Sequence, residues 1–286
     1  MKRPEYVTEE RIHHFIREAL REDLGDGDYS TLGSVPADKQ DRAKLLIKED
    51  TVLAGVELAQ EIYKFFDDSL KVNVLINDGE KVKKGDVAFT VEGSARSILM
   101  TERLILNCMQ RMSGIATYSR EMADLVKGTN AKILDTRKTT PNFRMCEKWA
   151  VYIGGSQNHR FGLFDMVMLK DNHNDYAGGI TKSVASVVNY LKENRLDLKI
   201  EVETRNLEEV KEALDTKAVD IIMLDNMSLD MMREAVQLIG NAAKTEASGG
   251  ITRKTVCAVA ETGVDFISSG SVIYGATPKD MSLKAY

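Results

Sequence analysis

The chain has 286 residues, a formal net charge of −5 at pH 7, 43% hydrophobic residues and 29% charged residues. This composition excludes a disordered or fibrous chain, and the acidic balance argues against partners such as nucleic acid or an anionic membrane. The three cysteines are far apart and form neither a disulfide framework nor a paired metal motif. Since no apolar run reaches the ~18 residues of a membrane-spanning helix and no secretory signal pattern is present, we expect a reduced, cytoplasmic protein.

The first part of the chain predicts helices mixed with short strands. Apolar residues recur at helical spacing over 8–20, with Thr8 placed to cap the helix, and again over 56–66. The acidic stretch 22–31 lacks the ligand spacing of a calcium-binding loop and predicts a turn that leads into a strand. Further strands are expected over 42–54, 70–76 and 87–92. This β-rich part resembles a lipoyl-type carrier but lacks its lysine-bearing hairpin, so a structural module is the preferred interpretation.

A long helical pattern covers 98–126, and Gly114 within it predicts a break into two helices. Arg103 and Arg111 lie in this stretch, and each, taken alone, is interpreted as a surface arginine.

From residue 132 onward, short apolar runs alternate with helical segments. The runs predict strands over 132–136, 166–170, 198–203, 219–225, 242–247 and 264–269. Helices are expected over 182–194, 207–214, 230–239 and 253–262. Repeated strand–helix units imply a parallel sheet with right-handed crossovers. The lack of a GxGxxG turn and the charged residues at the strand ends favour an incomplete α/β barrel over a Rossmann sheet.

Basic residues gather around the first two of these strands. Arg137 and Lys138 follow the first strand, His159 and Arg160 come after an intervening helix, and Lys170 ends the second strand. Because the carboxyl ends of parallel strands meet at one edge of the sheet, these side chains are expected to share a pocket. Such a pocket suits a small molecule that carries several negative charges.

Acidic residues occupy the next two strands. Glu201 and Glu203 are two apart on one strand and therefore share a face, and Asp225 closes the following strand. Buried carboxylates need cations, hydroxyls or a metal, so Glu203 and Asp225 are candidates for ribose hydroxyls or Mg²⁺. A structural salt bridge to neighbouring lysines is the alternative.

Small residues follow the last two strands, in Ser248-Gly249-Gly250 and Ser268-Ser269-Gly270-Ser271. Loops of this kind let backbone N–H groups approach an anion, and paired late-barrel loops often bind phosphate. No cysteine or serine has an evident partner base, so covalent catalysis is poorly supported. The inventory suits group transfer from a phosphosugar to an anionic acceptor.

These motifs resemble those of the quinolinate phosphoribosyltransferase family, the decarboxylating nicotinate-nucleotide pyrophosphorylases of NAD synthesis. The matching motifs are Glu22-Asp23-Leu24-Gly25, Thr101-Glu102-Arg103, Ser113-Gly114-Ile115-Ala116-Thr117, Asp135-Thr136-Arg137-Lys138-Thr139, Asn158-His159-Arg160, Lys170-Asp171-Asn172-His173, Glu201-Val202-Glu203, Leu224-Asp225-Asn226 and Ser248-Gly249-Gly250. They span nearly the whole chain. The resemblance implies an α/β fold with an open, incomplete (β/α) TIM-like barrel of about seven strands over 116–271. It also implies an N-terminal α/β sandwich domain over 1–115, joined by the C-terminal tail at about 272–286.

The resemblance further implies the reaction and its residues. Quinolinate would receive a phosphoribosyl group from phosphoribosyl pyrophosphate and lose CO₂, with Mg²⁺ as cofactor, held by Glu203 and Asp225 directly or through water. Quinolinate would be bound by Arg103, Thr136, Arg137, His159, Arg160 and Lys170. Phosphoribosyl pyrophosphate would be bound by Lys138, Glu203, Asp225, Ser248, Gly249, Gly250, Ser269 and Gly270. The catalytic set would be Lys138, Lys170, Glu203 and Asp225, and the resemblance assigns no definite role to Glu201.

The implied assembly is a homodimer in which Arg103 reaches the partner's site, and a trimer of such dimers is left open. Three departures from the family pattern stand out. Asn142 replaces a frequent glycine at a turn whose positive φ asparagine tolerates. Ser156-Gln157 replaces a glycine-rich run. Val272-Ile273-Tyr274 replaces a Thr-His pair, so the sequence does not define how the diphosphate is bound. The alternatives are a phosphoribosyltransferase that acts on nicotinate without decarboxylation, and a non-enzymatic phosphosugar sensor or carrier.

Overall fold

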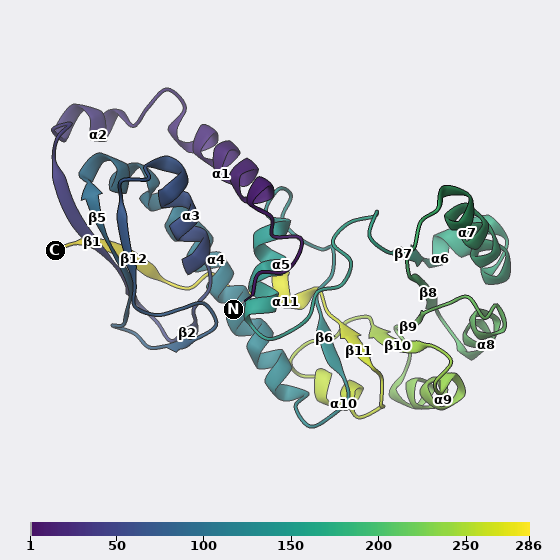
Figure 1. Ribbon diagram of the computed structural model, residues 1–286. Coiled ribbons are helices and arrows are strands. Elements are labelled where there is room, and N and C mark those ends of the chain that lie inside the picture. Colours follow the sequence, from purple (N-terminus) through teal and green to yellow (C-terminus); the bar gives the residue numbers. More distant parts are fainter. Residues whose placement is uncertain (1) are drawn as a thin grey trace. The chain divides into compact units, whose positions relative to one another are not determined.

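The computed structural model describes residues 2–286 and divides the chain into two compact units (Figure 1). Unit 1 holds the chain up to Arg120, together with Thr139–Gly155 and Val272–Tyr286. Unit 2 holds Glu121–Lys138 and Ser156–Ser271. Each unit therefore gathers segments that are distant in sequence, and each is described by itself below.

The main sheet of unit 1 is antiparallel, with strand order β12-β1-β5-β3. Its strands are β1 (Gln40–Ile47), β3 (Lys71–Val74), β5 (Val87–Ser94) and β12 (Met281–Ala285). A second, two-stranded sheet pairs β2 (Thr51–Val52) with β4 (Lys81–Val82). The C-terminal strand β12 is an edge of the main sheet, with Leu283 opposite Leu45 in register. The strands predicted in this part of the sequence are confirmed.

The helices of unit 1 are α1 (Glu9–Leu24), α2 (Tyr29–Ser34), α3 (Val56–Phe66), α4 (Ala95–Leu125), α5 (Arg144–Ile153) and α11 (Ser271–Tyr274), of which α4 and α11 extend into unit 2. The Thr8 hydroxyl caps α1 by accepting the Arg11 N–H, as predicted. The segment 22–31 does not lead into a strand as predicted. Its first part completes α1, and the Asp28 carboxylate accepts the Thr31 N–H and caps α2.

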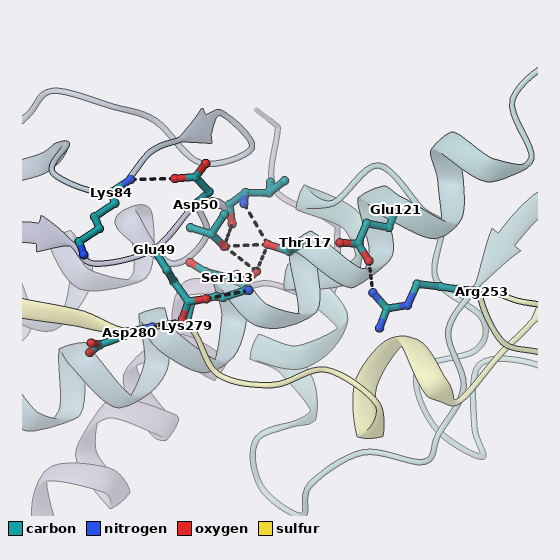
Figure 2. Close-up of polar contacts among 11 residues, drawn as sticks. Glu49, Asp50, Lys84, Ser113, Thr117, Glu121, Arg253, Lys279 and Asp280 are labelled. Carbon is teal, nitrogen blue, oxygen red and sulfur yellow. Dashed lines mark hydrogen bonds and ion pairs between the residues drawn. The ribbon is translucent and has the colours of Figure 1, made fainter.

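The predicted break at Gly114 is wrong, because α4 is one continuous helix. A Cβ at this position would lie 2.1 Å from the carbonyl oxygen of Thr277. Glycine is required here because the backbone at Thr277, which also belongs to unit 1, lies too close to leave room for a side chain. On the same helix, Ser113 accepts the N–H of Ala54 and Thr117 accepts the N–H of Val52, both at 2.9 Å (Figure 2). These hydroxyls join α4 to the strand β2 and its exit, so their role in this structure is structural.

Arg111 is another correction, since it is not a free surface arginine. Its guanidinium bonds the Glu147 carboxylate at 2.9–3.0 Å and donates to the carbonyl oxygens of Ala276 and Ile273. Glu147 is fully buried and also accepts the Thr140 N–H. This network ties three segments of unit 1 together.

The sheet of unit 2 is parallel and six-stranded, with order β6-β11-β10-β9-β8-β7. Its strands are β6 (Lys132–Leu134), β7 (Val167–Leu169), β8 (Ile200–Thr204), β9 (Ile221–Asp225), β10 (Lys244–Ser248) and β11 (Phe266–Ser268). All six strands were expected from the sequence, and the α/β class is confirmed. An isolated parallel bridge pairs Gln157 with Leu134 of β6, which adds a seventh extended segment beside the sheet.

The remaining helices are α6 (Asp171–Ala177), α7 (Ile180–Asn194), α8 (Leu207–Asp215), α9 (Leu229–Ile239) and α10 (Val256–Ala260). Figure 1 shows α7, α8 and α9 ranged along one side of the strands β7 to β10. Side chains on the opposite side of the sheet are therefore the ones available for a site. Among residues 2–286, none of the helices combines the length and apolarity that crossing a membrane requires.

Candidate active site

The carboxyl ends of the parallel strands in unit 2 share one edge, and most of the predicted site residues follow these ends. The Asp135 carboxylate is fully buried just after β6 and organises this edge. It accepts Nδ2 of Asn158 at 2.6 Å and the backbone N–H of His159 at 2.8 Å. The turn that carries His159 and Arg160 is therefore fixed beside β6.

Arg160 is held on the other side of this turn. Its Nη1 donates to the Met166 carbonyl oxygen at 3.1 Å, and its Nη2 lies 3.6 Å from the Met168 sulfur. Burial and the neighbouring guanidinium of Arg137 lower the pKa of Arg160, while the Glu201 and Asp165 carboxylates act in the opposite sense. The structure thus brings Arg137 and Arg160 together as a partly buried arginine pair, which favours an anionic ligand.

Lys170 and Glu203 meet at the ends of β7 and β8. Lys170 Nζ lies 3.2 Å from Glu203 Oε2, and the lysine side chain is half exposed while the glutamate is almost buried. The salt-bridge alternative is thus observed for Glu203. Because Lys170 is half exposed, a ligand bound at the carboxyl ends of the strands could still reach its ammonium group.

Deeper in unit 2, His159 meets two buried carboxylates. Its Nε2 lies 3.0 Å from Glu201 Oε2 and 3.5 Å from Glu246 Oε2, and the side chains of both acids are fully buried. Burial raises the pKa of Glu201 to about 8, against the opposing influence of Arg160 and Lys170. Burial together with the Glu201 carboxylate raises the pKa of Glu246 to about 8, while His159 and Ser268 act the other way.

Glu246 was missed by the sequence reasoning. The available signal was an acid in the interior of a predicted strand, the same feature that singled out Glu201. The two acids lie on β10 and β8, with β9 between them, so they come from alternate strands of the sheet. Side chains from alternate strands form the interior layers of an α/β barrel.

Asp225 ends β9 as predicted and adjoins a tightly packed glycine loop. Its Oδ2 accepts Nδ2 of Asn226 at 2.7 Å, and the backbone N–H of Asn226 donates to the Ser248 carbonyl oxygen. Gly249 has a φ of 105°, and a Cβ on it would lie 2.2 Å from Asn226 Oδ1. Glycine is therefore required at 249 on both conformational and steric grounds.

The second small-residue loop is bonded to the first. The Ser269 hydroxyl donates to the Ile251 carbonyl oxygen at 2.6 Å and also contacts the Ser271 hydroxyl at 2.7 Å. Ser269 is buried, so its hydroxyl joins the two loops and its side chain is occupied within the protein. Gly250 has a φ of 60°, and a Cβ on it would meet no atom within 4 Å.

The other predicted residues are placed as follows. The Lys138 side chain is exposed, and its backbone N–H donates to the half-buried Thr136 hydroxyl at 3.0 Å. Arg103 is exposed on the part of α4 that belongs to unit 1, so unit 2 alone does not bring it to the other basic residues. Asn142 has a φ of 61°, and the expectation that it adopts the left-handed turn is confirmed.

Both parts of the chain match models of one protein family. Residues 28–113 match the quinolinate phosphoribosyl transferase N-terminal domain, and residues 115–284 match the C-terminal domain of the same family. The chain belongs to the quinolinate phosphoribosyltransferase family.

Individual relatives agree with this placement. The chain is 46% identical to "Quinolinate phosphoribosyltransferase [decarboxylating] 2b, mitochondrial" of Nicotiana tabacum, over 99% of this chain and 84% of that protein. It is also 46% identical to "Nicotinate-nucleotide pyrophosphorylase [carboxylating], chloroplastic" of Arabidopsis thaliana, over 99% of this chain and 85% of that protein. The solved nicotinate-nucleotide pyrophosphorylase of Francisella tularensis superposes with a TM-score of 0.90 at 37% identity, covering 98% of each chain.

Proposed function

We propose that this chain transfers the phosphoribosyl group of phosphoribosyl pyrophosphate to quinolinate with decarboxylation. The products are nicotinate mononucleotide, pyrophosphate and CO₂, in de novo NAD synthesis. The observation that carries the proposal is that one unit holds the partly buried arginines Arg137 and Arg160 together with the acids Glu203 and Asp225 at the ends of β8 and β9, where Lys170 pairs with Glu203. Family membership supports the same reaction.

The dicarboxylate acceptor is assigned to the basic side of the site. A planar guanidinium pairs a carboxylate through two parallel hydrogen bonds, so Arg137 and Arg160 suit the two carboxylates of quinolinate. Lys170 adds a third cation, Thr136 a hydroxyl, and His159 supports the turn that presents Arg160. Lys170 is paired with Glu203, so it lies where acceptor and phosphosugar must meet.

The phosphosugar is assigned to the acidic and glycine-rich side. Glu203 and Asp225 suit ribose hydroxyls, and Lys138 suits a phosphate. The backbone of Ser248-Gly249-Gly250 and the loop at Ser269 and Gly270 suit the other anionic groups.

Mg²⁺ fits the donors at this edge, because it prefers one or two carboxylates together with substrate phosphates. Glu203 and Asp225 would hold it, directly or through water. When bound, it would supply positive charge to offset that of the leaving pyrophosphate.

The chemistry follows from these positions. The pyridine nitrogen attacks C1 of the phosphosugar as the bond to pyrophosphate breaks. Glu203 and Asp225 stabilise positive charge on the ribose, and Lys138 stabilises the leaving group. The new glycosidic bond makes the ring nitrogen cationic, so the ring accepts the electron pair when the 2-carboxylate leaves as CO₂, and a proton then takes its place. The task of the protein is positioning and electrostatic stabilisation.

The proposal also covers the barrel, the domain bounds, the oligomeric state and the location of the protein. Unit 2 is assigned an open barrel of about seven strands, in which the segment at Gln157 is the seventh and the opening lies between it and β7. The domains are assigned as a sandwich over 1–115 with the tail 272–286, and a catalytic domain over 116–271. We further assign a homodimer, in which Arg103 serves the partner's site, and a cytoplasmic location.

The test is incubation of the purified protein with quinolinate, phosphoribosyl pyrophosphate and Mg²⁺. Stoichiometric release of CO₂ and pyrophosphate is expected. Turnover of nicotinate without CO₂ release would instead indicate the related phosphoribosyltransferase. Binding of phosphoribosyl pyrophosphate without turnover of either acid would indicate a sensor.

A further inference from the structure

Glu246 has no part in the reaction proposed above, yet it completes the buried cluster with His159 and Glu201. The side chain of His159 is only 6% exposed, and those of both acids are 0% exposed. His159 Nε2 approaches both acids and the Ser268 hydroxyl approaches Glu246, but within residues 2–286 none of these contacts has both the distance and the angle of a normal hydrogen bond. Two buried carboxylates without ordinary donors are costly, so their presence around one imidazole nitrogen calls for a function.

The hydrogen bonding of His159 fixes which nitrogen faces the acids. Its Nδ1 accepts the backbone N–H of Arg160 at 2.7 Å and therefore carries no proton. The imidazole proton then lies on Nε2, the nitrogen that faces Glu201 and Glu246. This tautomer suits the cluster, because the Nε2–H of His159 is a donor and it faces two carboxyl groups that can accept.

The same tautomer argues against a metal ion at this cluster. A histidine and two glutamates are an acceptable donor set for a divalent metal, and their ligand atoms all lie within 4.8 Å of one another. However, a neutral imidazole that binds a metal through Nε2 carries its proton on Nδ1. That proton would point at the N–H of Arg160, which already donates to Nδ1.

The cluster is connected to the dicarboxylate pocket through one turn. Asp135 holds the backbone N–H of His159, and the His159 ring holds the backbone N–H of Arg160. The Arg160 guanidinium lies near enough to Arg137 for the two positive charges to interact. If the His159 ring is held at both nitrogens, it fixes the backbone of Arg160. The Arg160 side chain, which is assigned to bind quinolinate, then starts from a fixed position.

We propose that Glu246 is a positioning residue for the dicarboxylate acceptor. Together with Glu201 it orients the His159 imidazole through Nε2, and His159 then orients Arg160 through Nδ1. This inference rests on the proposed function for its kinetic consequence, but the cluster itself can be tested without turnover.

The kinetic test compares Glu246→Ala, Glu246→Gln and, as a matched control, Glu261→Gln, which alters an exposed glutamate of the same unit. Glu246→Ala should raise the quinolinate KM by about tenfold or more, the loss expected when one charge-assisted contact fails, and leave the phosphoribosyl pyrophosphate KM within about twofold. Glu246→Gln should retain more quinolinate affinity, because its amide oxygen can still face the Nε2 proton. Equal changes in both KM values, or none, would overturn the proposal.

The second test uses ¹⁵N NMR of the histidine side chains. The chain has only four histidines, and comparison with His159→Gln assigns the signal of interest. The protein should show His159 with its proton on Nε2, protected from exchange, and Glu246→Ala should lose that protection while Glu261→Gln keeps it. A proton on Nδ1, or one equivalent of tightly bound zinc in the purified protein, would exclude the proposed arrangement. Because this readout needs no turnover, failure of the proposed reaction is distinguishable from failure of the inference.

Discussion

At the scale of single residues, the arginine pair is the feature on which acceptor binding depends most. Arg137 lies close enough to Arg160 to lower the pKa of Arg160, and a dicarboxylate would relieve that repulsion. The sequence could predict their meeting, because Arg137 follows the first strand of the parallel sheet and Arg160 lies in the segment that joins this strand to the next. It could not predict that Arg160 is steadied by the backbone at Met166, since that contact depends on how the intervening loop folds.

We expect Arg160→Ala to weaken quinolinate binding by about 1.5–3 kcal/mol, the contribution of a hydrogen bond to a charged group. This corresponds to a rise in Kd of about 10- to 150-fold. Isothermal titration calorimetry with quinolinate measures the change. Arg233→Ala, which removes an exposed arginine paired with Asp230, is the control and should bind as the parent does. Parental affinity in Arg160→Ala would remove this residue from the site.

A second prediction concerns Glu246 and pH. Its pKa is raised from 4.5 to about 8 in the folded chain, chiefly by burial and by Glu201. A carboxyl with a raised pKa favours the folded state below its unfolded pKa, and this stability is lost as the pH rises through the folded pKa. The free energy of unfolding should therefore fall between about pH 4.5 and about pH 8, by an amount on the order of 1 kcal/mol or more.

Glu246→Gln isolates that contribution, because the amide does not ionise. Urea denaturation across this pH range should show a smaller decline for the variant than for the parent. Two parallel curves would mean that Glu246 has no raised pKa.

The sequence identified Glu201 but not Glu246. Their proximity depends on β9 separating β8 from β10, and strand order is not encoded in local periodicity.

At the scale of elements, hydrophobic periodicity was informative and glycine was misleading. The apolar spacing gave the bounds of α3 correctly and located every strand of the parallel sheet. Gly114 predicted a helix break because glycine weakens an isolated helix. The residue instead serves a contact with Thr277, which is distant in sequence and leaves no local signal.

The contact between Gly114 and Thr277 predicts that Gly114→Ala destabilises the protein, although helix propensity alone predicts stabilisation. An exposed Gly→Ala change within a helix stabilises by roughly 0.5–1 kcal/mol. Gly114→Ala should instead destabilise by about 1–3 kcal/mol or more, since its Cβ overlaps a backbone carbonyl that cannot yield easily. Gly33→Ala in α2, where a Cβ meets nothing within 4 Å, is the control and should be neutral or stabilising. Chemical denaturation of both variants decides the matter, and a stabilised Gly114→Ala would contradict the packing argument.

At the scale of the whole molecule, alternation of strands and helices predicted the parallel sheet but not the path of the chain between the units. Residues Thr139–Gly155 leave unit 2 directly after the basic cluster and pack within unit 1 before returning at Ser156. The helical pattern of α5 is visible in the sequence, yet nothing in a local pattern states which core that helix joins. The buried bond between Glu147 and Arg111 is the physical reason for its place in unit 1.

The last prediction concerns assembly. Arg103 is exposed on the part of α4 in unit 1, whereas Lys138 follows β6 in unit 2. If Arg103 serves the partner's dicarboxylate pocket, then Arg103→Ala and Lys138→Ala should each be inactive alone. In a mixed dimer, one site carries both lesions and the other carries neither. Random exchange makes about half of the dimers mixed, with half of their sites intact, so roughly a quarter of parental activity should return on mixing. No recovery after verified subunit exchange would place Arg103 in the site of its own chain, or outside the site.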